Sequence, residues 1–160
     1  MRLYTYTNMY MEGIHAGIQS LHVLGELNNK YNHSEINTYN KPTNLEAARK
    51  ILLDWQACHK VVFIYNGGLA SMLWDRYQAL REFANQFQLP IARFYESKEA
   101  LNGALTAVGI VVPEKYYRRH LIPKNQFPIA LTNGVGETLR SPKTREEEFY
   151  ELLHNCERAR

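Results

Sequence analysis

Cysteine is scarce in this 160-residue sequence, which has only Cys58 and Cys156, far apart along the chain. Two separated cysteines do not make a disulfide framework, and no Cys-x-x-Cys spacing indicates a zinc or redox site. The apolar runs are too short to span a bilayer. The N-terminal residues do not show the basic segment followed by an apolar segment that is typical of a secretory signal. We therefore expect reduced thiols in a cytoplasmic protein that does not interact with membranes.

The sequence also lacks a strong excess of charge and the best-known catalytic motifs. The net charge is +3 and charged residues make up 22% of the chain, which is compatible with an anionic ligand but is not a nucleic-acid signature. There is no Gly-x-Ser-x-Gly nucleophile elbow, and no Gly-Lys-Ser/Thr follows a glycine-rich loop. We expect no cofactor. We also expect no metal, because His15 and His22 are separated by about 10 Å along a helix, too far for one zinc ion.

What the sequence does contain is an alternation of strand and helix patterns. Length alone indicates one domain, and the order β-α-α-β-α-β-β-α predicts the α/β class, a three-layer sandwich with a mixed four-stranded sheet and helices on both faces. A C-terminal extension that ends in a helix follows. The continuous apolar run KVVFIY is typical of a buried central strand. The expected strands are 2–7, 60–65, 91–96 and 106–112, the expected helices 14–27, 43 onward, 70–87 and 144 onward, and 28–42 is expected to be a polar loop.

Polar residues recur along the first predicted helix at His15, Gln19 and His22, which share one face because they lie at i, i+4 and i+7. The apolar residues of this helix form an adjacent stripe that we expect to be buried, namely Ile14, Ile18, Leu21 and Leu24. The polar residues then either form a ligand-binding stripe, with His15 as base or hydrogen-bond donor, or belong to a solvated helix face. The pattern alone leaves both interpretations open.

Three further positions carry candidate ligand-binding groups. Asn66-Gly67-Gly68 lies between a strand and a helix, where free backbone N–H groups bind phosphate or carboxylate, unless the loop simply requires positive φ. Glu96 ends a strand and either orients a histidine, binds a ribose hydroxyl or is an ordinary surface carboxylate. Asn8, at the end of the first strand, is a candidate too.

A basic and aromatic cluster begins at Tyr116 and includes Arg118 and Arg119. Such a cluster either stacks a base and pairs with a phosphate, or forms an exposed basic turn.

The segment GIHAGIQSLHV resembles the first-helix motif of the class II peptidyl-tRNA hydrolases, the archaeal and eukaryotic type, Gly-Lys-x-Ala-Ala-Gln-x-x-His-Ala. Gln19 and His22 match its glutamine and histidine. KVVFIYN, LPIARFYES and TAVGIVVP follow the family's order of strands, and Thr106 matches a threonine before the last one. The resemblance covers residues 2–116 and implies a family-like domain at 1–116, with an extension at 117–160 packed on the same domain.

The sequence departs from the family at two positions that bear on the chemistry. His15 replaces the motif lysine, so the fixed positive charge is lost at neutral pH. Glu96 stands at the aspartate of the family's Asp-Ala-Gly-x-Thr segment, whose glycine and threonine are missing here.

These observations leave three functions open. The first is binding, or sequestration, of an anionic nucleotide-type ligand by a homo-oligomer, as in a bacteriophage anti-defence protein that captures a host nucleotide signal. The second is a divergent peptidyl-tRNA hydrolase or another ester or phosphodiester hydrolase that acts on a substrate such as a tRNA 3′ end, with His15 and Glu96 catalytic. The third is a protein-interaction module. The ligand-binding residues of the first are expected to be Asn8, His15, Gln19, His22, Asn66, Gly67, Gly68, Thr106, Arg118 and Arg119.

Overall fold

The computed structural model describes residues 1–11, 13–32, 43–118 and 143–156. The chain divides into two compact units, the first Met1–Glu114 with Cys156–Arg160 and the second Lys115–Asn155. Within the described ranges no helix is long and apolar enough to cross a membrane.

A mixed four-stranded sheet is the centre of the first unit, and its order is β2-β1-β4-β3. β1 pairs with β2 in parallel, while β4 is antiparallel to both β1 and β3. Three strands therefore run the same way and finish at one edge of the sheet. The strands are β1 (Arg2–Thr7), β2 (Val62–Asn66), β3 (Ile91–Tyr95) and β4 (Leu105–Val112).

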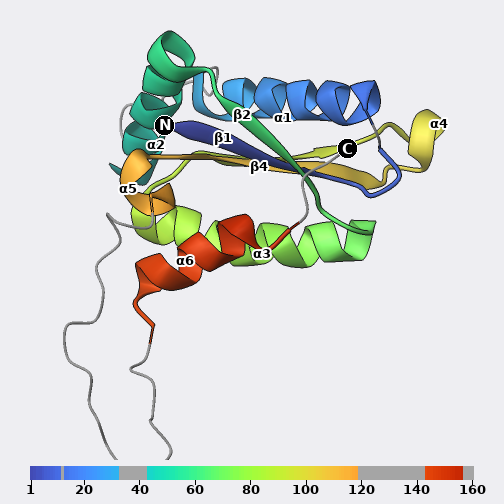
Figure 1. Ribbon diagram of the computed structural model, residues 1–160. Helices are drawn as coiled ribbons and strands as arrows, with labels where there is room; N and C mark the ends of the chain where they lie inside the picture. The colour runs from blue at the N-terminus through green and yellow to red at the C-terminus, as the bar shows by residue number, and fades with distance from the viewer. Residues whose placement is uncertain (12, 33–42, 119–142, 157–160) are drawn as a thin grey trace, which may run out of the picture. The chain divides into compact units, whose positions relative to one another are not determined.

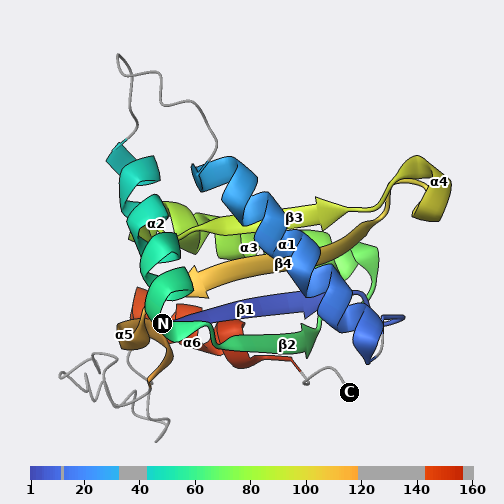
Figure 2. The same ribbon diagram turned by 90° about the horizontal axis from the view of Figure 1, so that it is seen from above.

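Helices cover both faces of this sheet, as the sequence predicted (Figures 1 and 2). On one face, α1 and α2 pack over a core built around Val23, Leu27 and Leu52. On the other face, α3 buries Leu73 and Leu80. The described helices of this unit are α1 (Ile14–Asn32), α2 (Thr43–Asp54), the π-helical turn η1 (Trp55–His59), α3 (Ala70–Phe87) and the short α4 (Lys98–Leu101), and α5 (Glu114–Tyr117) begins at its boundary.

The orientation of α1 differs from the sequence prediction. Its buried residues are Ala16, Gln19, Ser20, Val23, Leu27 and Tyr31, whereas Ile14 and Leu21 of the predicted apolar face are exposed. The reason is steric. A Cβ on Gly109 of β4 would overlap Val23, so α1 lies so close to the sheet that only a residue without a side chain fits beneath Val23. The helix also continues to Asn32, beyond the predicted end at 27.

The predicted position of the KVVFIY strand is also wrong. β2 is an edge strand, with β1 as its neighbour, and Val61 and Val62 are exposed. The apolar pattern predicted burial on both sides, and the sheet order, which sequence periodicity does not encode, leaves one side open.

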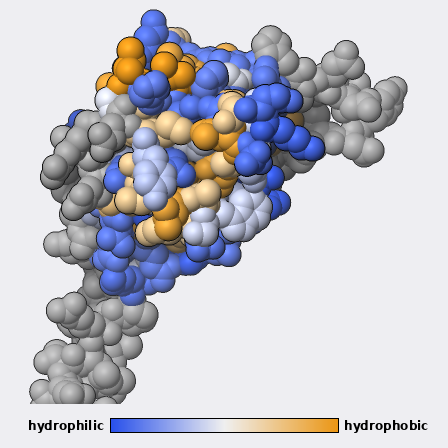
Figure 3. Space-filling model, turned by 90° about the vertical axis from the view of Figure 1, so that its right-hand side faces the viewer, coloured by the Kyte–Doolittle hydropathy of each residue, from blue (hydrophilic) through white to orange (hydrophobic). Residues whose placement is uncertain are grey.

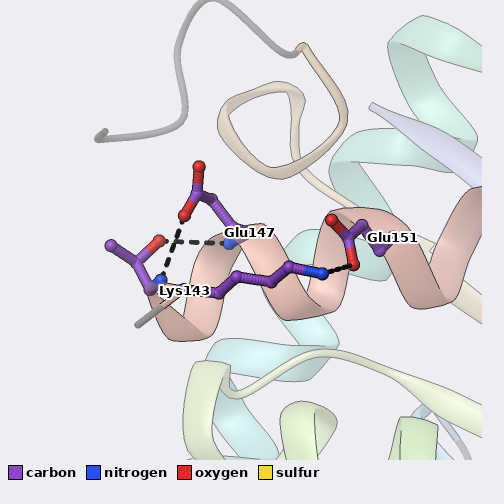
Figure 4. A network of polar contacts seen from close by, with 4 residues as sticks. Lys143, Glu147 and Glu151 are labelled. Atoms are coloured by element: carbon purple, nitrogen blue, oxygen red, sulfur yellow. Dashed lines mark hydrogen bonds and ion pairs between the residues drawn. The ribbon is translucent and has the colours of Figure 1, made fainter. Parts of the chain in front are cut away.

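The second unit contains α6 (Arg145–His154), which begins at a capping box formed by Thr144 and Glu147. The hydroxyl of Thr144 accepts a hydrogen bond from the Glu147 N–H at 3.2 Å, and the Glu147 carboxylate accepts one from the Thr144 N–H at 3.1 Å (Figure 4). An ion pair between Lys143 and Glu151, 2.6 Å apart, adds little, because both side chains are half-exposed.

A buried tyrosine links α1 to β3 and predicts how stability changes in alkali. The Tyr31 hydroxyl accepts a hydrogen bond from the Ile91 N–H at 3.1 Å, and burial raises the pKa of Tyr31 above its ordinary value of 10.0. Its contribution to stability is therefore complete below pH 10 and is lost as the pH rises toward the folded-state pKa. We expect the urea midpoint to fall above pH 10, and to fall less steeply in Tyr31→Phe. Equal slopes in the two proteins would contradict this assignment.

Candidate functional site

The carboxyl ends of the parallel strands gather the predicted site residues at one edge of the sheet. Asn8 follows β1, Asn66 ends β2, and Glu96 follows β3. Thr106 lies at the start of the antiparallel β4, and the N-terminal half of α1 packs over the same region. Figure 3 views this end of the molecule, where apolar surface lies exposed between hydrophilic residues. Ligands of α/β proteins bind at this end of the strands.

A hydrogen-bonded chain of three side chains is the most organised feature of this edge. The Gln19 amide nitrogen donates a hydrogen bond to Oε1 of Glu96 at 2.6 Å. The side-chain oxygen of Gln19 accepts one from the Thr106 hydroxyl at 2.7 Å. Gln19 and Thr106 are buried, and Glu96 is partly buried. The three residues are separated by up to 87 positions in the sequence, and all three are predicted site residues. We call them the Gln19 cluster.

The position of the cluster depends on an irregularity in β4. The register with β3 changes from Phe94↔Ala107 to Tyr95↔Leu105, which leaves Thr106 as an extra residue without a partner in β3. Bulges of this kind redirect a side chain and are frequent beside functional sites. Here the redirected hydroxyl is the one that bonds to Gln19.

The second polar pair under α1 holds the helix in the same orientation. Ser20 Oγ and Thr5 Oγ1 are 2.8 Å apart, and Ser20 also donates to the Ala16 carbonyl. Because buried polar groups are costly without partners, α1 is fixed at the rotation that satisfies Gln19 and Ser20 together. The Thr5–Ser20 pair was not predicted, because neither residue belongs to a motif with a recognisable spacing.

The two histidines of α1 have different surroundings. The His22 ring stacks on Phe94 with centroids 4.4 Å apart and planes at 12°, so it covers part of β3 while it is exposed on its other side. His15 is exposed one turn before Gln19 and makes no hydrogen bond within the described part of the chain. In particular, no hydrogen bond joins His15 to Glu96, so the predicted catalytic pair is not assembled in this conformation.

The Asn66-Gly67-Gly68 loop is held by its own hydrogen bonds. The Gly67 N–H donates to the Thr7 carbonyl at 2.7 Å, and the Gly68 N–H donates to the Asn66 side-chain oxygen at 2.9 Å. The free N–H groups expected for anion binding are therefore already engaged at both glycines. Gly68 has φ +80°, as the alternative interpretation of a turn required.

Asn8 has a similar structural contact, because its side-chain oxygen accepts from the Tyr10 N–H at 3.1 Å. Arg118 is exposed at the end of the range described in the second unit, and Arg119 lies outside the described residues.

A carboxylate that the sequence prediction missed follows the cluster on α4. Glu99 lies in α4, three residues after Glu96, and hydrogen bonds from its own N–H and from Ser97 lower its pKa. No group of three or more His, Cys, Asp or Glu suited to a metal ion occurs within the described ranges.

No family model matches the chain, and no curated protein matches its sequence. The resemblance to the class II peptidyl-tRNA hydrolases thus stays a prediction from the motif residues.

Proposed function

We propose that the chain binds a nucleotide-type ligand at the Gln19 cluster, with His15 beside it. The observation that supports this most is the convergence of Gln19, Glu96 and Thr106. These three residues were selected on separate motifs of the family resemblance, and they form one hydrogen-bonded chain.

The chemistry of the cluster favours the hydroxyl or N–H donors of a nucleotide over its phosphate. An ionised carboxylate only accepts hydrogen bonds, and Gln19 occupies one oxygen of Glu96. The other oxygen suits a ribose hydroxyl or an exocyclic amine. The phosphate of the ligand is expected toward the amino end of α1 and His15, where the helix dipole is positive.

Hydrolysis is the second candidate, favoured by the same convergence, since the resemblance implies an esterase acting on a tRNA 3′ end. It requires His15 to reach the reacting group as a base, and His15 has no orienting contact within the described residues. Binding needs no such contact. We therefore prefer sequestration to hydrolysis. The corresponding role is that of a cytoplasmic phage protein that captures a host nucleotide signal.

Calorimetric titration with a panel of linear and cyclic nucleotides tests the proposal. We expect saturable binding to the wild-type protein and at least tenfold weaker binding to Glu96→Gln, because a hydrogen bond to a charged acceptor contributes about 1.5–3 kcal/mol. Glu82→Gln is the matched control, since Glu82 is an exposed carboxylate on α3. Mass spectrometry of the denatured complex shows whether the nucleotide is intact.

Three outcomes decide between the candidates. Intact nucleotide at one equivalent supports sequestration. Turnover of nucleotide or peptidyl-tRNA that is lost in His15→Ala supports the hydrolase instead. Wild-type affinity in Glu96→Gln, or no binding to any member of the panel, would contradict the assignment of the site.

A further inference from the structure

Two segments whose sequences are typical of buried elements are both exposed in the described chain. On α1 the apolar stripe is open to solvent, with 76% of Ile14 and 67% of Leu21 exposed. On β2 the run expected at the centre of a sheet lies at its edge, with 41% of Val62 exposed. The two segments come from different parts of the chain, and each has an apolar pattern that its own unit does not bury.

These segments face each other across one groove of about 530 Å³. The floor is formed by Leu3, Val62 and Ile64, and the wall by side chains of α1. Figure 2 shows this part of β1 and β2 between α1 and α2, with neither helix lying over it. None of the nine lining residues is charged, and large exposed apolar patches on folded domains mark interaction sites.

Among the strands of the described residues, β2 has a partner only on its β1 side. Val61 accepts a hydrogen bond from the Leu3 N–H, and Phe63 accepts one from the Thr5 hydroxyl. Because backbone groups alternate in direction along a strand, those of Val62 and Ile64 point away from β1. The other edge strand, β3, carries Arg93 at its middle residue, a charge of the kind that protects an edge, and β2 has none.

We propose that β2 and the α1 groove form the interface of a homodimer, in which two β2 strands pair antiparallel about a twofold axis. The two four-stranded sheets then join into one continuous sheet. Both α1 helices lie on the same face of it, and each exposed ridge of Ile14, Ile18 and Leu21 borders the groove of the partner copy.

A second copy fits this surface better than a different protein for three reasons. The ridge of α1 forms one wall of the groove along β2, so a twofold axis presents the same ridge and the same strand edge from each copy to the other, as an isologous interface requires. The absence of charged lining residues means that two identical surfaces meet without like-charge repulsion. Homodimer interfaces are also the more apolar class, and seven of the nine residues that line the groove are Leu, Ile or Val.

The pairing also restores what the sequence predicts for both segments. In the dimer β2 becomes a central strand, as its continuous apolar run indicates. The stripe of α1 becomes buried, as its helical spacing indicates. The Gln19 cluster lies toward β3 and β4, away from β2, so the dimer does not depend on the proposed nucleotide site.

Sedimentation equilibrium on the full chain tests the interface. We expect the wild-type protein to have twice the 18.7 kDa mass of one chain, and Val62→Lys to have the mass of one. A lysine on an exposed edge position is tolerated by the monomer and prevents strand pairing. Leu101→Lys is the matched control, because Leu101 is similarly exposed on α4 after β3, and it should remain dimeric.

Hydrogen exchange gives a second measurement that needs no variant. The amides of Val62 and Ile64 should exchange slowly at concentrations where the dimer forms, and at least tenfold faster on dilution to the monomer. A monomeric wild-type protein at all concentrations, a dimeric Val62→Lys with a native circular dichroism spectrum, or a dimer whose Val62 and Ile64 amides exchange freely would each overturn the proposal.

Discussion

Gly109→Ala is expected to destabilise the first unit by about 2 kcal/mol, in the range measured for overpacked cores. A Cβ at this position would overlap the Cγ1 of Val23 and lie 3.3 Å from Cγ2 of Thr5. Val23 is buried, and its β-branched side chain has little rotamer freedom in a helix. The substitution therefore forces α1 away from the sheet. Urea unfolding monitored by circular dichroism measures the loss.

Gly25→Ala is the matched control for this prediction. Gly25 lies in α1, the helix that carries Val23, and a Cβ on Gly25 meets nothing within 4 Å. Alanine is better than glycine in a helix interior by about 0.8–1.0 kcal/mol, so this variant should be more stable than the wild-type protein. If Gly109→Ala were as stable as Gly25→Ala, the assignment of Gly109 as the residue that permits the close approach of α1 to β4 would be wrong.

Gln19→Leu is expected to cost about 3 kcal/mol, although it places an apolar residue in a buried position. It removes the donor to Glu96, where a hydrogen bond to a charged group contributes about 1.5–3 kcal/mol, and it leaves the buried Thr106 hydroxyl without its acceptor. The free energy of unfolding measures the sum. Gln78→Leu on α3 makes the same change at a partly exposed glutamine that has no hydrogen bond within the described residues, and it should be nearly neutral.

A pair of substitutions at Thr106 separates the hydrogen bond from the packing. Thr106→Val keeps the shape and removes the hydroxyl, so it should cost about 1–3 kcal/mol because the Gln19 oxygen stays buried without a donor. Thr106→Ser keeps the hydroxyl and should retain nucleotide affinity. Equal stability in the two variants would show that the Thr106–Gln19 bond does not hold the cluster.

The proposed dimer and the proposed nucleotide site use opposite sides of α1. One side carries Gln19 toward Glu96 and Thr106, and the other carries Ile14, Ile18 and Leu21 toward β2. A ligand that changes the position of α1 would alter both sides at once, because the helix is rigid over this length. Failure of one proposal nevertheless leaves the other testable, since neither Val62→Lys nor Glu96→Gln touches the residues of the other site.

Local patterns in the sequence determined the elements and their class. The helix from Ala70 to Phe87, the capping box at Thr144 and Glu147, and the strands around the sheet follow from periodicity and side-chain hydrogen bonding over a few residues. The positions of Gln19, Glu96 and Thr106 were also selected from the sequence, through their motifs. That the three make contact was not, because it depends on strands that pair over long separations.

Tertiary structure alone decided which face of α1 is buried and which strand lies at the sheet edge. Periodicity identified the apolar stripe of Ile14, Ile18 and Leu21, but Gly109 and the Thr5–Ser20 pair fix the helix with a smaller, more polar face against the sheet. Likewise, the continuous apolar run of β2 predicts a strand with a neighbour on each side. The observed order β2-β1-β4-β3 instead places β2 at an edge of the sheet. The apolar pattern predicts which residues are suited to burial, and tertiary packing determines which surfaces they are buried against.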